Sequence, residues 1–546
     1  MKTRYKSSKY YRNNYFLVTM CTLVLLGLSN CTKNFDKLNT DPTGIANKDL
    51  QIPTLFIPLE QEIMYSADDG YQVGQNLNAD IYAGYSCPPQ FFGTSLNNMN
   101  YVLLDIWNPE GFNSIYTNLI GPTKNKLAAT GVKTTLPDFW AIALIVEAEA
   151  IDRVTDKFGP VPYSKVGTSL VSIPYDSQQS IYQQMFAQLD TATTTLNSFI
   201  TAHPGQTPFA NSDVVYGGDY TKWLKFANSL RLRLAMHLVK IDPATAQAQA
   251  EKAMSAAGGL LSTPDDDAAV AVAGQNDYWQ ITSSYTDNSM NASIESYMVG
   301  YNDPRLPVYF LPVNTDPTQP GPLPAQYAGQ YIGIRLGTDV HSKPLYSGFS
   351  VYNYNTTFTV TTKETIMTAA EVWFLKSEAA LRGWAGAGDA QTDYQTGIQT
   401  SMSQYGVGAA ATAYMADATS KPIDYVDPNN SADNSPALSA ITIKWDPAAT
   451  NEVKLERIIT QKWLAMFPEG QEAWTEFRRT GYPKLFPVVN NYSGGTISTD
   501  IQVRRLAYPL SEYSSNGTAV QAGVTLLGGP DNGGTRLWWD VNKPNF

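Results

Sequence analysis

The chain has 546 residues, of which 43% are hydrophobic and 16% charged, which is the balance of a globular protein and excludes disorder over most of its length. The formal net charge of −11 argues against a nucleic-acid partner, because an acidic surface repels phosphates. The chain is rich in aromatic residues, with 33 Tyr, 20 Phe and 11 Trp. Such a composition suits either a large core or a surface that binds sugars or peptides.

The first 31 residues carry the pattern of an exported lipoprotein. Five basic residues precede an apolar run from Phe16 to Leu28, which is too short to span a bilayer and predicts a cleaved signal. Leu28-Ser-Asn-Cys31 follows and resembles a lipobox, in which the Cys31 thiol receives diacylglycerol. We therefore expect a signal peptide at residues 1–30, a lipidated linker at 31–50 and a permanent membrane tether. The alternative is an ordinary signal peptide with an incidental cysteine.

Processing would change both the charge and the cysteine content. The signal takes away five basic residues and no acidic one, so the formal charge of the mature chain becomes −16. Cys21 leaves with the signal and Cys31 carries lipid, so Cys87 has no partner. We expect a fold without disulfides and without a cysteine-based metal site.

Helices alternate with irregular stretches along the rest of the chain. Helices are predicted at 53–67 and 71–83, before a Gly-, Pro- and Asn-rich stretch from Tyr85 to Phe112 that carries several rings. Further helices are expected from Leu136 to Val154, from a capping box at Asp176 and Gln179, from Ile366 to Trp384, and from Tyr394 to Tyr405. The segments 258–362, 406–450 and 488–546 are predicted to be loop-like.

The clearest single element is the stretch from Asp213 to Lys240. Asp219 follows two glycines and is a good N-cap for an apolar stripe at helical spacing that includes Leu230 and Leu234. We expect both leucines to be buried. Arg231, Arg233 and His237 lie among the apolar positions, so their polar groups need carboxylates or carbonyls nearby.

This stretch and several later motifs resemble the SusD/RagB family of nutrient-binding lipoproteins. The motifs that carry the resemblance keep the family order over nearly the whole mature chain: Tyr216–Met236, Asp156–Tyr163, Asp303–Leu306, Gln461–Trp463, Glu472–Trp474, Phe477–Pro483 and Arg504–Pro509. His237 stands where the family pattern has arginine, so its pairing is expected to depend on pH.

The resemblance implies a mainly α fold. Its tetratricopeptide-like helix pairs form a scaffold covered by long irregular loop regions, with residues 51–546 as one domain. No clean 34-residue repeat is visible, so periodicity alone does not give this fold.

The residues themselves carry no recognisable catalytic or metal motif. His203, His237 and His341 fall in no metal-ligand spacing. Residues 427–433 alternate oxygen ligands as a calcium loop does, but Ala432 replaces the glycine at the sixth position, which favours a solvated turn. We expect no catalytic residue, no metal and no cofactor, although 49 acidic residues leave room for a glycosidase pair of carboxylates.

The family resemblance implies a lipoprotein of the outer membrane, facing the cell exterior. It would bind a glycan or a peptide and pass it to a SusC-like TonB-dependent β-barrel transporter. The implied ligand-binding residues are rings and polar groups from an early and a middle loop region: Tyr82, Tyr85, Phe91, Phe92, Trp107, Tyr278, Trp279, Tyr285, Asp287 and Asn288. Two alternatives stay open, a surface hydrolase acting on glycans and a helical-repeat lipoprotein that binds peptides or only assembles other proteins.

Overall fold

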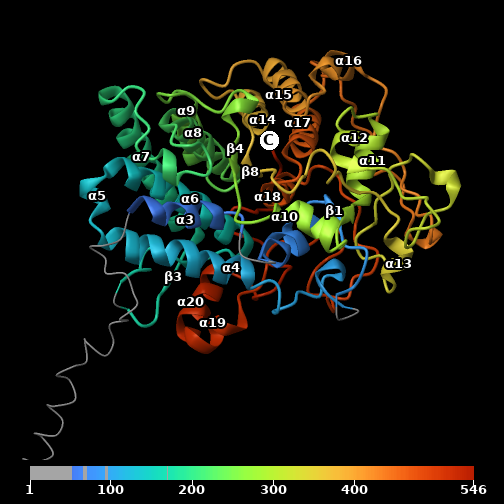
Figure 1. Ribbon diagram of the computed structural model, residues 1–546, viewed down its shortest axis with the longest axis horizontal. Coiled ribbons are helices and arrows are strands. Elements are labelled where there is room, and N and C mark those ends of the chain that lie inside the picture. The colour runs from blue at the N-terminus through green and yellow to red at the C-terminus, as the bar shows by residue number, and fades with distance from the viewer. Residues whose placement is uncertain (1–51, 66–69, 93–95, 169) are drawn as a thin grey trace, which may run out of the picture. The chain divides into compact units, whose positions relative to one another are not determined.

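Pairs of antiparallel helices form the scaffold of the protein in a computed structural model that describes residues 52–65, 70–92, 96–168 and 170–546. The helix α6 (Pro137–Phe158) packs on α7 (Gln178–Ala202), α8 (Tyr220–His237) on α9 (Pro243–Met254), and α14 (Ala369–Leu381) on α15 (Ala390–Gln404). The helix α14 also contacts α8 and α17 (Asn451–Met466), and α17 contacts α18 (Gly470–Thr480), so the pairs form one scaffold (Figure 1). This confirms the predicted mainly α, tetratricopeptide-like architecture.

Shorter elements and irregular backbone fill the remainder. The other α-helices are α3 (Phe56–Glu62), α4 (Glu110–Ser114), α5 (Val132–Thr135), α10 (Asp277–Trp279), α11 (Ala292–Gly300), α12 (Leu306–Tyr309), α13 (Lys343–Tyr346), α16 (Ala411–Ala416), α19 (Leu510–Ser515) and α20 (Gly517–Leu527). The short strands form antiparallel two-stranded ladders: β1 (Ser86–Cys87) with β5 (Ser289–Met290), β2 (Val161–Pro162) with β3 (Tyr175–Asp176), β4 (Ala268–Val270) with β8 (Glu364–Met367), and β6 (Phe310–Leu311) with β7 (Val351–Tyr352).

The helix α8 has the start and the burial that the sequence predicts. The side chain of Asp219 accepts hydrogen bonds from the amides of Thr221 (2.9 Å) and Lys222 (3.3 Å), which satisfies two of the free N–H groups at the helix start. Leu230 and Leu234 are both 0% exposed. Because α8 contacts α7, α9 and α14, it is surrounded by other helices of the scaffold.

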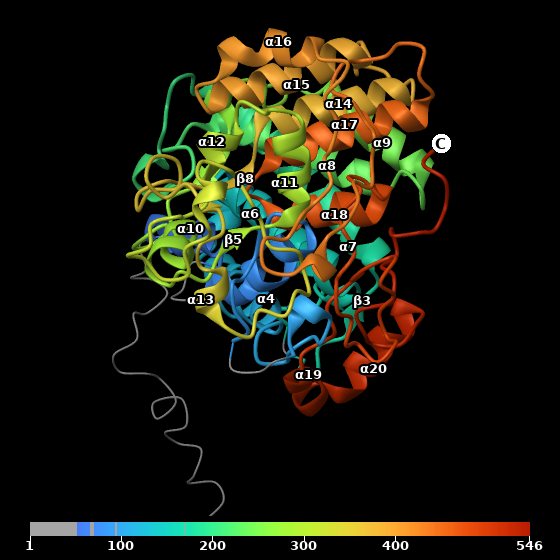
Figure 2. The ribbon, with the colours of Figure 1, turned by 90° about the vertical axis from the view of Figure 1, so that its right-hand side faces the viewer.

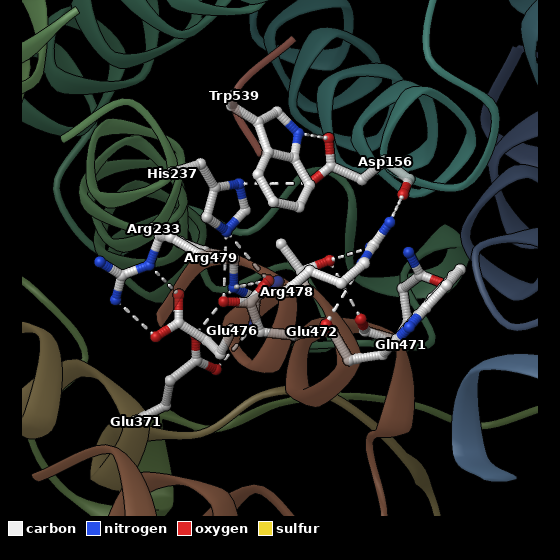
Figure 3. A network of polar contacts seen from close by, with 12 residues as sticks. Asp156, Arg233, His237, Glu371, Gln471, Glu472, Glu476, Arg478, Arg479 and Trp539 are labelled. Carbon is white, nitrogen blue, oxygen red and sulfur yellow. Dashed lines mark hydrogen bonds and ion pairs between the residues drawn. The ribbon is translucent and has the colours of Figure 1, made fainter. Parts of the chain in front are cut away.

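A network of buried charges joins α8 to α14, α17 and α18 (Figure 3). Arg233 donates two hydrogen bonds to Glu371, at 2.8 and 2.7 Å, and His237 Nε2 lies 3.2 Å from Glu472. Arg231 pairs with Asp190 at 2.6 Å. The three basic side chains of α8 therefore have the acceptors that the sequence analysis required. The pH dependence of the His237 contact stays a prediction.

Several local predictions were wrong. The helix expected from Ile366 begins only at Ala369, because residues 364–367 form β8 and Thr368 caps the helix by accepting from the amide of Glu371 at 3.1 Å. The cap of α7 is Ser177; the carboxylate of Asp176 instead accepts from the amides of residues 163 and 164. The segments that the sequence predicts to be loop-like contain helices: α10, α11, α12 and α13 lie within 258–362, α16 within 406–450, and α19 and α20 within 488–546.

Residues 52–546 form one compact unit. Among the described residues, no helix combines the length and the apolar character that crossing a membrane requires. The expected signal peptide (1–30), the linker (31–50) and its lipidation site Cys31 lie outside the described residues.

Candidate ligand-binding surface

The pairing of β1 with β5 brings the early and the middle loop regions together. Ser86 pairs with Met290 and Cys87 with Ser289 in antiparallel register. The chain leaving β1 therefore runs beside the chain that enters β5. Gln90 and Asp287, which lie 197 positions apart in the sequence, are in contact as a consequence.

Asp287 makes the polar contacts between the early and the middle loop regions. Its Oδ1 accepts hydrogen bonds from Gln90 Nε2 at 2.7 Å and from Lys343 Nζ at 2.6 Å. Lys343 also donates to the carbonyl oxygen of Tyr285 at 2.9 Å. Both members of the ion pair remain partly open to solvent, with 27% of the Lys343 side chain and 14% of the Asp287 side chain exposed. The amide, carboxylate and ammonium groups can therefore reach a bound molecule.

Four predicted rings lie at the surface of the same loops. Tyr285 is 36% exposed, and Phe91, Phe92 and Trp279 are half-buried. Trp107 is only 8% exposed and packs edge to face against Phe92, with ring centroids 5.8 Å apart. Trp107 thus packs against Phe92 and helps to hold its ring in place. We define the candidate surface as Gln90, Phe91, Phe92, Trp107, Trp279, Tyr285, Asp287 and Lys343.

The other four predicted site residues belong to the core, and this corrects the sequence analysis. Tyr82 packs against Trp474 and donates to the carbonyl oxygen of Asn98 at 3.2 Å. Tyr85 stacks on Trp463 at a centroid distance of 5.5 Å and donates to its carbonyl oxygen.

The other two predicted site residues that belong to the core are Tyr278 and Asn288. Tyr278 packs between the rings of Tyr71 and Phe358, and Asn288 donates to the hydroxyl of Thr282 at 3.1 Å. None of the four buried side chains presents a face on which a ligand could lie.

Thr286, at the tip between Tyr285 and Asp287, has a backbone φ of 54°. A β-branched residue adopts this left-handed conformation rarely and at a cost of about 1–3 kcal/mol. Strain of this kind persists where the surrounding structure holds it, and it is concentrated at binding and catalytic sites.

Sequence reasoning missed Gln90 and Lys343. They lie 197 and 56 positions from Asp287 along the chain. Neither belongs to a motif, and only the β1–β5 pairing and the placement of α13 bring them to the carboxylate. No signal in the sequence identifies them.

Within the described residues, two buried clusters have metal-ligating atoms close together. They are Asp152, Asp156 and His237, and His237, Glu472 and Glu476. Lys462 lies 3.3 Å from Glu472 and 3.4 Å from Glu476. Burial raises the pKa of Asp152 well above its ordinary range, and the neighbouring Asp156 adds to the effect. The negative charges of these carboxyl groups are balanced by neighbouring protein cations or removed by protonation. We therefore assign both clusters to the buried charge network of the core.

The loop 427–433 differs from the expected solvated turn, because Asp427 and Asp433 are buried. Asp427 Oδ1 accepts from the amides of Asn429 (2.8 Å) and Asn430 (2.9 Å), and Oδ2 accepts from the hydroxyl of Tyr425. The carboxylate oxygens thus stabilise the turn itself.

Comparisons with known proteins agree with this architecture. The sequence model of the SusD-like family, described as Susd and RagB outer membrane lipoprotein, matches residues 33–540. A chitin-binding SusD homologue from Flavobacterium johnsoniae is 44% identical, with a TM-score of 0.85 over 91% of this chain and 100% of its own.

Two further solved structures are similar to a lesser degree. A SusD homologue from Bacteroides vulgatus is 35% identical, with a TM-score of 0.84 over 90% of this chain and 98% of its own. One from Bacteroides uniformis is 34% identical, with a TM-score of 0.82 over 90% and 99%. Among curated proteins, none matches the chain. The family match over most of the chain and these structural relatives place this protein in the SusD/RagB family of outer-membrane lipoproteins.

Proposed function

We propose that this protein is a cell-surface lipoprotein that binds an oligosaccharide of the chitin class and delivers it to a SusC-like TonB-dependent transporter. The observation that carries the proposal is its 44% identity to a chitin-binding SusD homologue whose whole length it covers. The ligand is bound and passed on uncut, so the protein is not an enzyme.

The candidate surface has the chemistry that such a ligand requires. Each sugar ring of chitin has apolar C–H faces and carries an acetamido group with one N–H and one C=O. Aromatic rings such as Trp279 and Tyr285 fit the apolar faces. Asp287 can accept from an amide N–H, and Gln90 and Lys343 can donate to a carbonyl or hydroxyl oxygen.

The alternatives are a surface hydrolase and a peptide-binding or scaffolding lipoprotein, and one set of measurements separates them. Calorimetry compares chito-oligosaccharides with cello-oligosaccharides and with short peptides, and chromatography of the incubated sugars detects cleavage. We expect binding of the chito-oligosaccharides and their recovery uncut. Shortened products would support the hydrolase, and binding of peptides alone would support the peptide receptor.

Replacement of Trp279 or Tyr285 by alanine is expected to weaken binding of a chito-oligosaccharide by about 1–2 kcal/mol, because each ring buries a modest area against a sugar. Isothermal titration calorimetry measures the change. Since both rings are at least partly exposed, the melting temperature should stay close to that of the parent.

Trp384→Ala is the matched control, because Trp384 is also half-buried but lies just after α14, outside the candidate surface. Its affinity should equal that of the parent. If Trp279→Ala and Tyr285→Ala bind as the parent does, or if Trp384→Ala loses as much as they do, the ligand does not lie on the candidate surface.

Replacement of Cys31 by alanine is expected to release the protein from the outer membrane, because it removes the thiol that accepts the lipid. Fractionation of cells expressing the parent and Cys31→Ala measures the membrane-bound share. The buried Cys87 supplies the control, since Cys87→Ala removes a thiol without touching the anchor. Membrane attachment that survives in Cys31→Ala would show that the anchor lies elsewhere.

A further inference from the structure

A cavity of about 740 Å³ lies at the end of α18, and the C-terminal residues form one of its walls. Figure 2 marks the C-terminal end near α9. Just after α8, the Nζ atoms of Lys240 and Lys543 each donate to the carbonyl oxygen of the other residue at 3.3 Å. The cavity shares no residue with the candidate surface. Its charged lining is made of Lys240, Glu452, Arg478, Arg479, Lys484, Asp500, Arg504, Arg536 and Lys543.

The lining is therefore basic in a protein that is acidic as a whole, with seven cationic and two acidic side chains. Three of the cations have carboxylate partners that are not part of the cavity lining. Arg479 is bound by Glu378 and Glu476, at 2.6 and 2.7 Å. Arg504 and Arg536 share the single carboxylate of Asp540, so this trio keeps one positive charge.

The contacts of the other four cations are of a different kind. The ammonium groups of Lys240 and Lys543 donate to carbonyl oxygens, and that of Lys484 lies 4.5 Å from the centre of the Tyr482 ring. Arg478 donates to the carbonyl oxygens of residues 156, 474 and 504 and to the hydroxyl of Thr475 (Figure 3 shows its place on α18). Backbone carbonyls and rings carry no net charge, so Lys240, Lys484 and Lys543 make no ion pair with a described carboxylate, whereas Arg478 lies in the field of Asp156 and Asp540.

The two acidic residues of the lining do not restore the balance. Glu452 Oε1 already accepts from the hydroxyl of Tyr482 and from Asn545 Nδ2, both at 2.8 Å, and Asp500 is exposed. Burial, together with the guanidinium groups of Arg479, Arg504 and Arg536, lowers the pKa of Lys240 to about 8 although Asp540 acts in the opposite direction. An anion bound in the cavity would reduce the repulsion between these positive charges.

We propose that this cavity is a second binding site, which takes a saccharide carrying a sulfate or carboxylate group. Its volume lies within the range of small-ligand sites and exceeds what a single free ion fills. Phe477, Leu485 and Ile501 give the lining apolar faces beside its cations. Such a mixture suits a sugar ring that bears an anionic substituent, because the ring covers apolar surface while the oxyanion meets the ammonium and guanidinium groups.

The test compares three probes at constant ionic strength: inorganic sulfate, a sulfated or uronate-containing oligosaccharide, and the neutral oligosaccharide of the same backbone. Calorimetry on the full chain is expected to show binding of the charged oligosaccharide. The variant K240Q/K543Q should bind it about tenfold more weakly or worse, since two charge-assisted contacts are lost. The neutral oligosaccharide should bind the parent and this variant equally, so a failure of the glycan proposal for the candidate surface would be seen separately.

K363Q is the matched control, because the Lys363 ammonium also donates only to carbonyl oxygens, those of Val214 and Val215, and lies outside the cavity. It should bind the charged oligosaccharide as the parent does, and melting curves of all variants verify that they are folded. The proposal is overturned if the charged oligosaccharide does not bind, if inorganic sulfate binds as tightly as it does, or if K363Q loses as much affinity as K240Q/K543Q.

Discussion

Replacement of Arg479 by methionine is expected to lower the free energy of unfolding by about 3–5 kcal/mol, the largest single effect that we predict for this protein. The guanidinium is fully buried and donates to both Glu378 and Glu476, with distances of 2.6–2.8 Å. Without it, two carboxylates stay in the core with less positive charge to balance them. Chemical denaturation of the parent and R479M measures the loss.

The origin of this loss can be tested by neutralising the carboxylates as well. In the triple variant R479M/E378Q/E476Q no unpaired charge remains, so it should be more stable than R479M although it lacks more of the native contacts. If the triple variant is the less stable of the two, the loss comes from packing and not from uncompensated charge.

The loss should also depend on pH in a defined direction. Burial raises the pKa of Glu378, but Arg479 and Arg382 outweigh it and hold the pKa well below its ordinary value. In the parent, Glu378 thus contributes stability above the pKa of an unfolded glutamate, about 4.3, and this contribution is lost as the pH falls further. In R479M burial and the Arg382 contact remain but the Arg479 guanidinium is lost, so the pKa of Glu378 should rise and protonation should relieve part of the penalty. The difference between parent and variant should therefore be smaller at pH 5 than at pH 7.5.

Replacement of Leu234 by alanine is expected to cost about 2–5 kcal/mol, because it removes buried methyl groups and leaves a cavity that close-packed neighbours fill only in part. Leu234 is fully buried in α8, the helix that contacts α7, α9 and α14. The neighbouring helices are themselves held by the charge network, which limits how far they can move to close the cavity. Thermal or denaturant unfolding measures the effect.

Leu526→Ala is the matched control, since Leu526 is also helical but about half exposed in α20. Its stability should change by no more than about 0.5 kcal/mol, as is usual for exposed positions. A Leu234→Ala variant as stable as this control would mean that α8 is not in the core of the protein.

The two binding regions that we propose differ in the chemistry of their charges. At the candidate surface, Asp287 pairs with Lys343 at 2.6 Å and leaves a balanced, partly exposed group suited to a neutral sugar. In the C-terminal cavity, Lys240, Lys484 and Lys543 lie without a carboxylate contact of this kind. A glycan with both neutral and acidic units would engage both regions, and the calorimetric tests of each region use separate variants.

The sequence by itself determined the burial of α8, and its motifs carried the family resemblance that implied the helix-pair scaffold. The burial of α8 depends on local rules that act within one or two helical turns: Asp219 caps its own helix, and Leu230 and Leu234 recur at helical spacing. The sequence also required polar partners for the three basic residues of α8. It did not identify these partners, which are Asp190 for Arg231, Glu371 for Arg233 and Glu472 for His237.

Only the tertiary structure decided which rings are exposed and which polar groups meet. Tyr82 and Tyr85 occur in the same aromatic-rich part of the sequence as Phe91 and Phe92, yet the first two pack against Trp474 and Trp463 from the distant helices α18 and α17. Asp287 likewise meets Gln90 and Lys343 only through chain pairing over long separations. Contacts between segments far apart in the chain decide which rings are buried and which polar side chains meet. A local pattern of residues does not predict such contacts.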